Sequence, residues 1–282
     1  MAWKRKACEF IEYENIHSIH FDSSSITAVS AANLVGIVVF AQVKSGYIYI
    51  VKFDEATGFK KTDELISCGT FTFCRMNLLE LDGKIILAYP SNSVENAVNV
   101  ITIHDNNKDY LLKDHLVQGS GMCLFTKLKK LKDSRIILVC GYESGKLSVL
   151  DYSNGQALFE GKCFEGGESC TDADLYEDNN LIKLIVTGTG KIIKVFNDFD
   201  LSSAHDLIIP FAGCNAVTTR SDGKLFVTGG WDCKLRFFSL KSLKPLAVID
   251  HHFEAITAVE ILENNEIVAA SSDGTISIWS LF

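Results

Sequence analysis

The chain lacks an excess of basic charge and a long apolar run, and each absence excludes a class of protein. Lysine and arginine total 27 against 35 acidic residues, a net charge of −8, which disfavours a nucleic-acid-binding surface. No run of about 18 apolar residues occurs, and Met1–Lys6 begins no signal peptide, so we expect no membrane span. With 282 residues, 47% apolar, and only three prolines, the chain can bury a large core, as one all-β domain or two smaller ones.

Paired cysteine motifs are also missing. The nine cysteines are an odd number, and no C-x-x-C pair occurs. Cys74, Cys123 and Cys140 lie inside apolar, strand-like runs, where a free thiol behaves as a small hydrophobic group. Reduced core cysteines predict a protein of the nucleus or the cytoplasm.

Complete catalytic signatures are absent as well. The chain contains neither G-x-S-x-G nor H-E-x-x-H. Gly188–Lys191 resembles part of a phosphate-binding loop, but it joins two expected strands and is interpreted as a hairpin turn. His17 and His20 lie three apart on an expected strand and point to opposite faces, and the other close pair is His251 and His252. We therefore expect no catalytic residues, no cofactor and no metal site.

The clearest pattern that is present lies in the last thirty residues. Ala255–Ile261, Glu266–Ser271 and Thr275–Ser280 alternate apolar and polar residues, and the turn between the last two contains Asp273-Gly274. This patterning predicts three short antiparallel strands. With His252 ahead of the first strand and a tryptophan in the third, the segment resembles a WD40 repeat, a four-stranded propeller blade that here lacks its final strand.

A strand like the one that contains Trp279 recurs along the chain. The matching positions are spaced by 53, 46, 46, 42 and 41 residues: Val51, His104, Leu150, Phe196, Phe238 and Trp279. A WD40 repeat is about 40–45 residues long, so six blades are countable, and we expect residues 1–282 to form a single all-β, WD40-type β-propeller domain. No segment has a 3.6-residue apolar period over a dozen residues, so almost no helix is expected.

The two ends of the repeat region are complementary. The last blade has three strands, and Cys8–Tyr13 is a strand without a blade of its own. Because an open sheet edge invites aggregation, we expect the strand at Cys8–Glu12 to pair antiparallel with Thr275–Trp279 and so close the propeller.

Four residues of the last blade are expected to form a structural hydrogen-bond network: His252, Ser271, Asp273 and Trp279. The histidine would meet the aspartate of the turn, a hydroxyl on the second strand and the indole N–H of the third. Ser272 is the alternative to Ser271. The Ser-His-Asp trio also suggests a hydrolase, but its position in the blade favours a structural role. Blade five keeps Asp232 but has phenylalanine in place of tryptophan, so an incomplete network is expected there.

Two charged groups are interpreted as solvated loops. Six acidic residues surround the start of blade four, with a docking patch for a basic partner as the alternative: Glu165, Glu168, Asp172, Asp174, Glu177 and Asp178. Four lysines precede blade three's second strand, with a phosphate or partner patch as the alternative: Lys127, Lys129, Lys130 and Lys132.

The C-terminal block carries a more specific resemblance. It consists of Gly229–Phe238, Lys244–Val248 and Ile276–Phe282, and its distinctive residues are Trp231, Asp232, Arg236 and Phe238. With shorter stretches at Phe73–Arg75, Ala88–Pro90, Gly121–Leu124 and Gly141–Gly145, it resembles the ASTRA-associated protein 1 family of WD40-repeat proteins, which includes G-protein β-subunit-like protein 1.

The resemblance implies a non-enzymatic scaffold of the ASTRA and co-chaperone assembly. In that role the protein helps phosphatidylinositol-3-kinase-related kinases (PIKKs) to mature, in company with RuvB-like AAA+ ATPases, and takes part in chromatin remodelling. The resemblance also implies seven blades, one more than can be counted. Asp54–Thr70 has room for one outer strand and a turn only, so either the second blade is absent or an exon is lost from the gene model. No partner site on that blade is carried over.

Other classes of function are open to a propeller. The chain could be a generic WD40 adaptor in another complex. A small-molecule binder or enzyme that uses the central channel would need convergent polar residues with perturbed pKa values, and the sequence shows none. A Gβ-like signalling subunit normally has a long N-terminal coiled-coil helix, whereas about a dozen residues precede the first blade here, so we reject this class.

Overall fold

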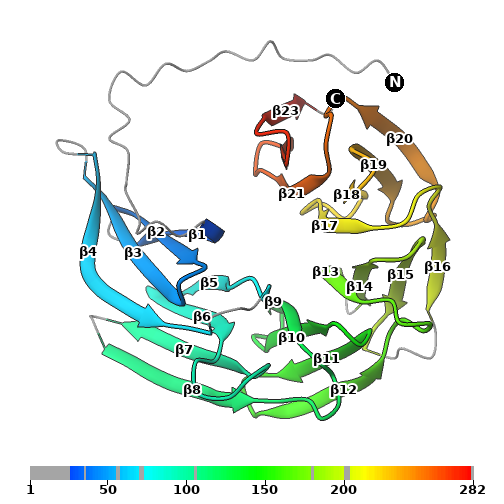
Figure 1. The fold of residues 1–282 in the computed structure, drawn as a ribbon. Coiled ribbons are helices and arrows are strands. Elements are labelled where there is room, and N and C mark those ends of the chain that lie inside the picture. The colour runs from blue at the N-terminus through cyan, green and yellow to red at the C-terminus, as the bar shows by residue number, and fades with distance from the viewer. Residues whose placement is uncertain are drawn as a thin grey trace. The chain divides into compact units, whose positions relative to one another are not determined.

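A computed structural model of the protein describes residues 26–34, 36–54, 58–69, 73–104, 107–178, 181–199 and 204–280 (Figure 1). Every regular element within these ranges is a β-strand. The expected closing strand at Cys8–Glu12 and the histidines His17 and His20 lie outside the described residues.

The strands form six sheets, and within each sheet consecutive strands are hydrogen-bonded neighbours. The first two sheets contain β1 (Ile26–Leu34), β2 (Gly36–Val43), β3 (Tyr47–Asp54) and β4 (Gly58–Ser67), then β5 (Asn77–Leu81), β6 (Lys84–Pro90), β7 (Val98–His104) and β8 (Asn107–His115). The third and fourth contain β9 (Cys123–Lys130), β10 (Ile136–Tyr142), β11 (Lys146–Asp151) and β12 (Gln156–Lys162), then β13 (Cys170–Asp178), β14 (Leu181–Gly188), β15 (Ile192–Asn197) and β16 (His205–Ile208). The last two contain β17 (Cys214–Thr219), β18 (Leu225–Gly230), β19 (Lys234–Ser239) and β20 (Pro245–Asp250), then β21 (Ile256–Ile261), β22 (Glu266–Ser271) and β23 (Ile276–Ser280).

Such a four-stranded meander is the blade of a β-propeller, so the predicted fold class and the count of six blades are confirmed. All six marker positions fall on the third strand of their sheets, from Val51 on β3 to Trp279 on β23. Between Asp54 and Thr70 the residues that the structure describes, 58–69, hold β4 and no further blade. Within the described residues the sixth sheet has three strands, so the edge of β23 has no partner there.

The described chain divides into two compact units. One unit contains the residues up to Glu143 together with Ser148–Glu160, and the other contains Ser144–Leu147 together with the residues from Gly161 onward. The first therefore holds blades one and two and most of blade three, and the second holds blades four to six. The single domain expected over residues 1–282 stays a prediction.

The position of a strand within its sheet sets its burial pattern. All seven residues of β10 are buried, as are all six of β18. Each is the second strand of its four-stranded sheet, where side chains on both faces of the sheet are covered. The fourth strands β8, β12 and β16 are largely exposed. Apolar runs therefore mark the inner strands clearly, whereas the outer strands have little signal in the sequence.

In the second unit, acidic side chains on the first strand of blade four bind the backbone of blade five. Asp172 accepts a hydrogen bond from the Val217 N–H at 3.0 Å. Asp174 is buried and accepts bonds from the N–H and the hydroxyl of Thr219, at 2.7 and 2.6 Å. In blade five, the Asn215 amide donates to the Ile256 carbonyl at 2.9 Å, which links that blade to blade six.

In the first unit, uncharged side chains form the hydrogen bonds that link one blade to the backbone of the next. The Gln42 amide donates to the Cys74 carbonyl at 2.9 Å and accepts from the Met76 N–H at 2.8 Å. Asn77 accepts from the Leu128 N–H at 2.8 Å, which links blades two and three. These bonds satisfy backbone groups on edges that would otherwise be buried without partners.

Candidate functional site

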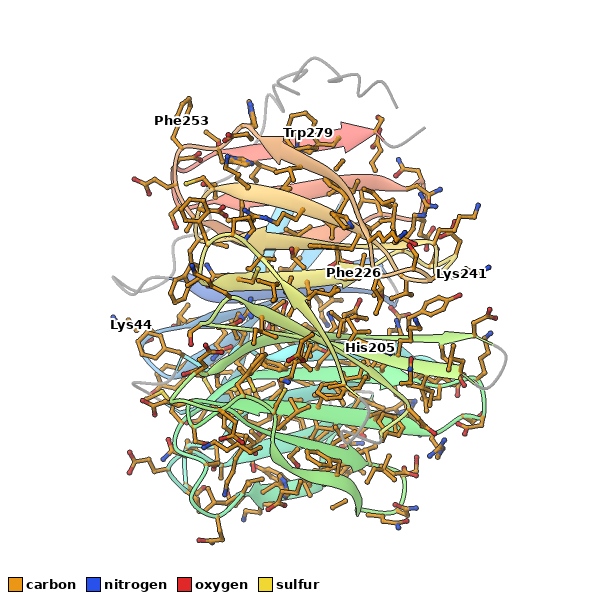
Figure 2. The ribbon with its side chains drawn as sticks, turned by 90° about the vertical axis from the view of Figure 1, so that its right-hand side faces the viewer. Lys44, His205, Phe226, Lys241, Phe253 and Trp279 are labelled. Carbon is orange, nitrogen blue, oxygen red and sulfur yellow. The ribbon has the colours of Figure 1, made fainter. Side chains whose placement is uncertain are left out.

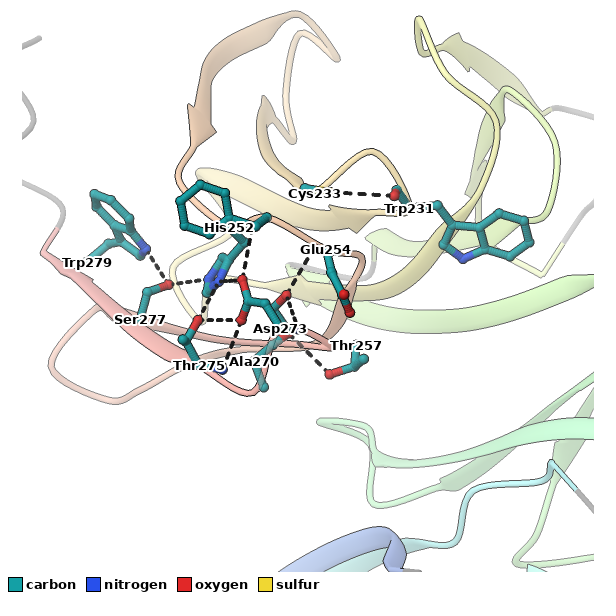
Figure 3. Close-up of polar contacts among 12 residues, drawn as sticks. Trp231, Cys233, His252, Glu254, Thr257, Ala270, Asp273, Thr275, Ser277 and Trp279 are labelled. Atoms are coloured by element: carbon teal, nitrogen blue, oxygen red, sulfur yellow. Dashed lines mark hydrogen bonds and ion pairs between the residues drawn. The ribbon is translucent and has the colours of Figure 1, made fainter.

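The hydrogen-bond network of blade six centres on His252, a buried residue in the loop between β20 and β21 (Figure 3). Its Nδ1 lies 3.3 Å from an Asp273 carboxylate oxygen and 3.0 Å from the Thr275 hydroxyl. Its Nε2 lies 2.8 Å from the Ser277 hydroxyl, which also accepts the indole N–H of Trp279 at 2.8 Å. The structure thus links His252 to Asp273 directly and to Trp279 through the Ser277 hydroxyl.

Ser271 has a different role from the expected one. Its hydroxyl donates to the Glu254 carbonyl at 3.0 Å and accepts from the Asp273 N–H at 3.2 Å. The hydroxyl that joins histidine to tryptophan is that of Ser277, on the third strand instead of the second. Ser277 lies two residues before Trp279, so both side chains point to the same face of β23. This spacing is the signal that sequence reasoning missed.

Asp273 is held by the turn between β22 and β23. The Thr275 hydroxyl donates to it at 2.5 Å and the Phe253 N–H at 2.9 Å, and these two bonds lower the pKa of the Asp273 carboxyl below its usual range. The carboxylate therefore stays ionised at neutral pH and fixes both the turn and the imidazole. No water-activating role follows, because the histidine's two nitrogens are engaged by Asp273, Thr275 and Ser277.

The lowered pKa predicts a pH dependence of stability. A carboxyl whose pKa is lower in the folded state than in the unfolded state stabilises the fold at pH values above its unfolded pKa of about 3.9. This contribution is lost as the pH falls through the lower pKa of the folded state. The melting temperature of Asp273→Asn should therefore lie furthest below that of the wild type at neutral pH, and the gap should narrow below about pH 4. Thermal unfolding measured across this range checks the sign. Asp109→Asn, an exposed aspartate on β8, is the control and should show no such gap.

Blade five contains a buried ion pair where blade six has its histidine network. Arg236 and Asp232 form a two-point ion pair, with an Nη1–Oδ1 distance of 2.8 Å and a closer contact between Nη2 and Oδ2. Arg236 precedes Phe238 by two residues, as Ser277 precedes Trp279, so it occupies the equivalent strand position. Gly230 leaves space for the pair, since a Cβ there would lie 2.4 Å from Asp232 Oδ1. Blade five thus keeps Asp232 with a charged partner, Arg236, that the comparison with the tryptophan network did not anticipate.

The pair also shifts the pKa values of both groups. Burial would raise the pKa of Asp232, but the hydrogen bond and the charge of Arg236 outweigh burial and lower it. The same hydrogen bond raises the pKa of Arg236. Phe238 does not join the polar pair but stacks on Phe226, with ring centroids 5.1 Å apart. Two of the four distinctive residues of the C-terminal block thus form the ion pair, and Phe238 belongs to the core.

The fourth, Trp231, lies on a loop face that we define by the exposed aromatics Phe211, Trp231 and Phe253. In a meander the connections alternate between the two ends of the sheet, so the loops that carry these residues lie at one end of blades five and six. Figure 2 shows Phe253 and Lys241 at opposite ends of the strands and Phe226 among them. Phe253 is 88% exposed, Phe211 58% and Trp231 44%.

The indole of Trp231 is held in place although it is exposed. Its N–H donates to the Asn215 amide oxygen at 2.6 Å. The ring lies against Gly213, where a Cβ would come within 2.1 Å of it and where the backbone φ of +92° also favours glycine. A large exposed apolar side chain with a fixed orientation is typical of a protein-binding surface.

The acidic charge near this face is mostly paired. Cys233, at the turn beside Trp231, has a raised pKa because of burial and of four surrounding carboxylates: Asp232, Asp250, Asp273 and Glu254. Asp250 binds Lys234 at 2.6 Å, Asp232 binds Arg236 and Asp273 lies beside His252. The loop face is therefore predominantly an aromatic surface.

The two charged groups that the sequence places in loops are found largely on strands. Asp172, Asp174, Glu177 and Asp178 lie on β13, and the first two bind blade five, so this group is not a solvated loop. Lys127, Lys129 and Lys130 lie on β9, and only Lys132 is in the following turn. A period-two pattern of charge along an amphipathic strand explains both corrections.

A cavity of about 600 Å³ lies between turns of blades one and two in the first unit. Its walls include Ser45, Cys68, Ser91, Glu95 and Cys123. Burial raises the pKa of the Cys68 thiol to about 12, and burial with neighbouring thiols raises that of Cys123. Protonated thiols are weak nucleophiles, so this cavity offers no activated group for covalent chemistry.

The cysteines of the described residues are all free, and all but Cys233 are buried. Cys74, Cys123 and Cys140 belong to one core cluster, as expected from their apolar strand contexts. The part of the chain that the structure describes contains no group of three or more His, Cys, Asp or Glu residues placed to hold a metal ion. It also contains no helix with the length and apolar character needed to cross a membrane.

Comparisons with known proteins match the C-terminal blades most directly. The family model for the WD domain, G-beta repeat, matches residues 203–239 and 243–280. The crystal structure of the computationally designed Ika8 protein is similar to 92% of this chain and 72% of its own, with a TM-score of 0.60 and 20% identity. At this identity the likeness shows the fold alone.

Two curated relatives extend the similarity beyond the repeat itself. The mouse guanine nucleotide-binding protein subunit beta-like protein 1 is 30% identical over 217 residues, 74% of this chain and 64% of the mouse protein. ASTRA-associated protein 1 of Schizosaccharomyces japonicus is 35% identical over 174 residues, 54% of this chain and 46% of the yeast protein. The chain thus spans less than two thirds of the length of either relative. It is a WD40-repeat protein with the β-propeller fold, similar at modest identity to these two proteins.

Proposed function

We propose that the protein is a non-enzymatic scaffold of the ASTRA and co-chaperone assembly. Its partners would be components of that assembly, the PIKKs that mature with its help, and RuvB-like AAA+ ATPases, and a role in chromatin remodelling would follow from the same contacts. With such partners, the protein would work in the nucleus and the cytoplasm. The similarity to proteins named ASTRA-associated protein 1 supports the choice of assembly.

The loop face is the observation that carries the scaffold proposal. Three large aromatic side chains at one end of blades five and six are exposed, and the Asn215 hydrogen bond and Gly213 fix the orientation of one of them. Exposing such apolar area costs free energy in water unless a partner covers it. Trp231 also belongs to the sequence block that most resembles the family, so the same residues indicate both the surface and the assembly.

The residues that could suggest an enzyme have structural roles instead. The Ser-His-Asp trio of blade six is bonded into its own turn, and the imidazole nitrogens are engaged within the blade. The thiols that line the 600 Å³ cavity have raised pKa values and stay protonated at neutral pH. These observations favour a binding protein over a hydrolase or a thiol enzyme.

A paired variant tests the loop face directly. We expect Trp231→Ala combined with Phe253→Ala to lose ASTRA components in affinity purification with mass spectrometry, because both anchors of the surface are removed. Leu246→Ala combined with Val248→Ala is the matched control, since these apolar residues are also exposed, on β20 of the same unit, but lie away from the loop face. It should retain the partners. If the wild-type protein pulled down no ASTRA component, the choice of this assembly would be wrong, and the alternative of a generic WD40 adaptor in another complex would stand.

Depletion of the protein tests its role in the cell. Steady-state levels of the PIKKs should fall while their transcripts stay constant, because an immature client is unstable and is degraded. The purified protein should show no hydrolase, kinase or nucleotide-binding activity. Normal kinase levels after complete depletion would contradict a role in kinase maturation.

A further inference from the structure

One carboxylate beside the loop face has no counter-ion among the described residues. Burial and four surrounding carboxylates raise the pKa of the Cys233 thiol. Three of these carboxylates are engaged in ion pairs or hydrogen bonds within blades five and six: Asp232, Asp250 and Asp273. The fourth belongs to Glu254, whose side chain is exposed and makes no ion pair or hydrogen bond with the part of the chain that the structure describes. One negative charge next to Cys233 is therefore free.

A single side chain, Asn215, links the exposed indole of Trp231 to the segment that contains Glu254. The amide oxygen of Asn215 accepts the Trp231 N–H at 2.6 Å, and its amide nitrogen donates to the Ile256 carbonyl at 2.9 Å. Ile256 follows Glu254 by two residues. The backbone of Glu254 is held as well, because its carbonyl accepts the Ser271 hydroxyl at 3.0 Å. The indole and the carboxylate are thus presented by loops that hydrogen bonds fix relative to each other.

The Cys233 side chain shows that the two groups are neighbours. Its Sγ lies 3.9 Å from the Trp231 carbonyl oxygen, and the Glu254 carboxylate is close enough to contribute to the raised pKa of the thiol. In the view of Figure 3, Cys233 and Glu254 lie between Trp231 and His252. The Trp231 ring rests on Gly213 and is still 44% exposed, so a ligand can reach it from the side away from that glycine.

An aromatic ring beside a free carboxylate suits a planar cation. A guanidinium group is attracted to the face of an indole and can form two parallel hydrogen bonds with a carboxylate. The ammonium of lysine is a compact, strongly hydrated point charge and gains less from such a pair of groups. The two other aromatics add apolar surface on the same loops. Phe211 is two residues before Gly213, and Phe253 adjoins Glu254.

We propose that the loop face binds a partner segment through an arginine flanked by apolar residues. The guanidinium stacks on the Trp231 indole and pairs with the Glu254 carboxylate, and the apolar neighbours cover Phe211 and Phe253. The proposal rests on the scaffold function proposed for the same face and adds the chemistry of the segment that binds there. Charge complementarity selects this partner, because a segment with an acidic residue at this place would meet the free carboxylate.

The probe is acetyl-leucyl-arginyl-leucinamide, titrated into the full chain with 15N-labelled tryptophan. The indole N–H resonance of Trp231, identified by its loss in Trp231→Phe, should shift and saturate. The citrulline analogue keeps the planar shape without the charge and should bind at least about fivefold more weakly. Added salt should reduce this preference. Equal binding of the two peptides, tighter binding of the glutamate analogue, or no saturable shift with the arginine peptide would overturn the proposal.

Three variants locate the charge that recognises the arginine. Glu254→Gln should lower the affinity for the arginine peptide to that for the citrulline peptide, without a change in melting temperature, because the exposed carboxylate has no partner in the described fold. Glu263→Gln, an exposed glutamate in the turn between β21 and β22 at the opposite end of blade six, is the matched control and should keep the preference. Lys191→Ala, in the turn between β14 and β15, should not weaken binding. A preference for arginine that survived Glu254→Gln would overturn the proposal.

These titrations and the pull-downs can fail separately. If the arginine peptide is preferred but no ASTRA component co-purifies, the choice of assembly is wrong and the chemistry of the loop face stands. If ASTRA components co-purify through the loop face but the arginine and citrulline peptides bind equally, the scaffold function stands and the arginine proposal is wrong.

Discussion

Asp232→Ala should lower the free energy of unfolding by about 3 kcal/mol. The substitution leaves the Arg236 guanidinium, which is only 5% exposed, without its carboxylate partner, and an uncompensated buried charge is among the most destabilising changes in a protein. We choose the lower end of the usual range because Asp232 is itself not fully buried. Urea unfolding measured against the wild type gives the value.

A double variant tests the cause. Asp232→Leu combined with Arg236→Met replaces the pair by apolar side chains, and most of the lost stability should return because no charge remains buried. The exposed pair of Lys234 and Asp250 provides the control, and Lys234→Ala should change the free energy by no more than about 0.5 kcal/mol. If Asp232→Ala were as mild as this control, the buried pair would not hold blade five together.

The fold could be predicted because propeller blades repeat a readable pattern. The second strands β10 and β18 are fully buried, and apolar runs of this kind, recurring at intervals close to one WD40 repeat, locate the blades. The fourth strands could not be located as well. β16 is four residues long and β12 is mostly exposed, so both carry ordinary surface sequence.

The polar interior was harder to predict because its partners lie far apart in the sequence. Asp174 and Thr219 are 45 residues apart, and no local pattern shows that a carboxylate of one blade binds the backbone of the next. The ion pair of Asp232 and Arg236 is local, with a separation of four residues. The sequence comparison, however, considered only Phe238, which replaces the tryptophan of blade six, and overlooked Arg236 two residues before it. The two-residue offset of Arg236 and Ser277 from the marker position is the pattern that would have identified both.

Blade six offers the same kind of test with a neutral network. Trp279→Phe keeps most of the buried ring but removes the N–H that binds the Ser277 hydroxyl, and we expect a loss of about 1–3 kcal/mol in the free energy of unfolding. Ser277→Ala removes the hydroxyl that serves both Trp279 and His252, so it should cost at least as much. In the double variant the two losses should fall short of their sum, because each single change already breaks the shared bond. Additive losses, measured by urea unfolding of all three variants, would show that the indole and the imidazole are held independently and that Ser277 does not join them.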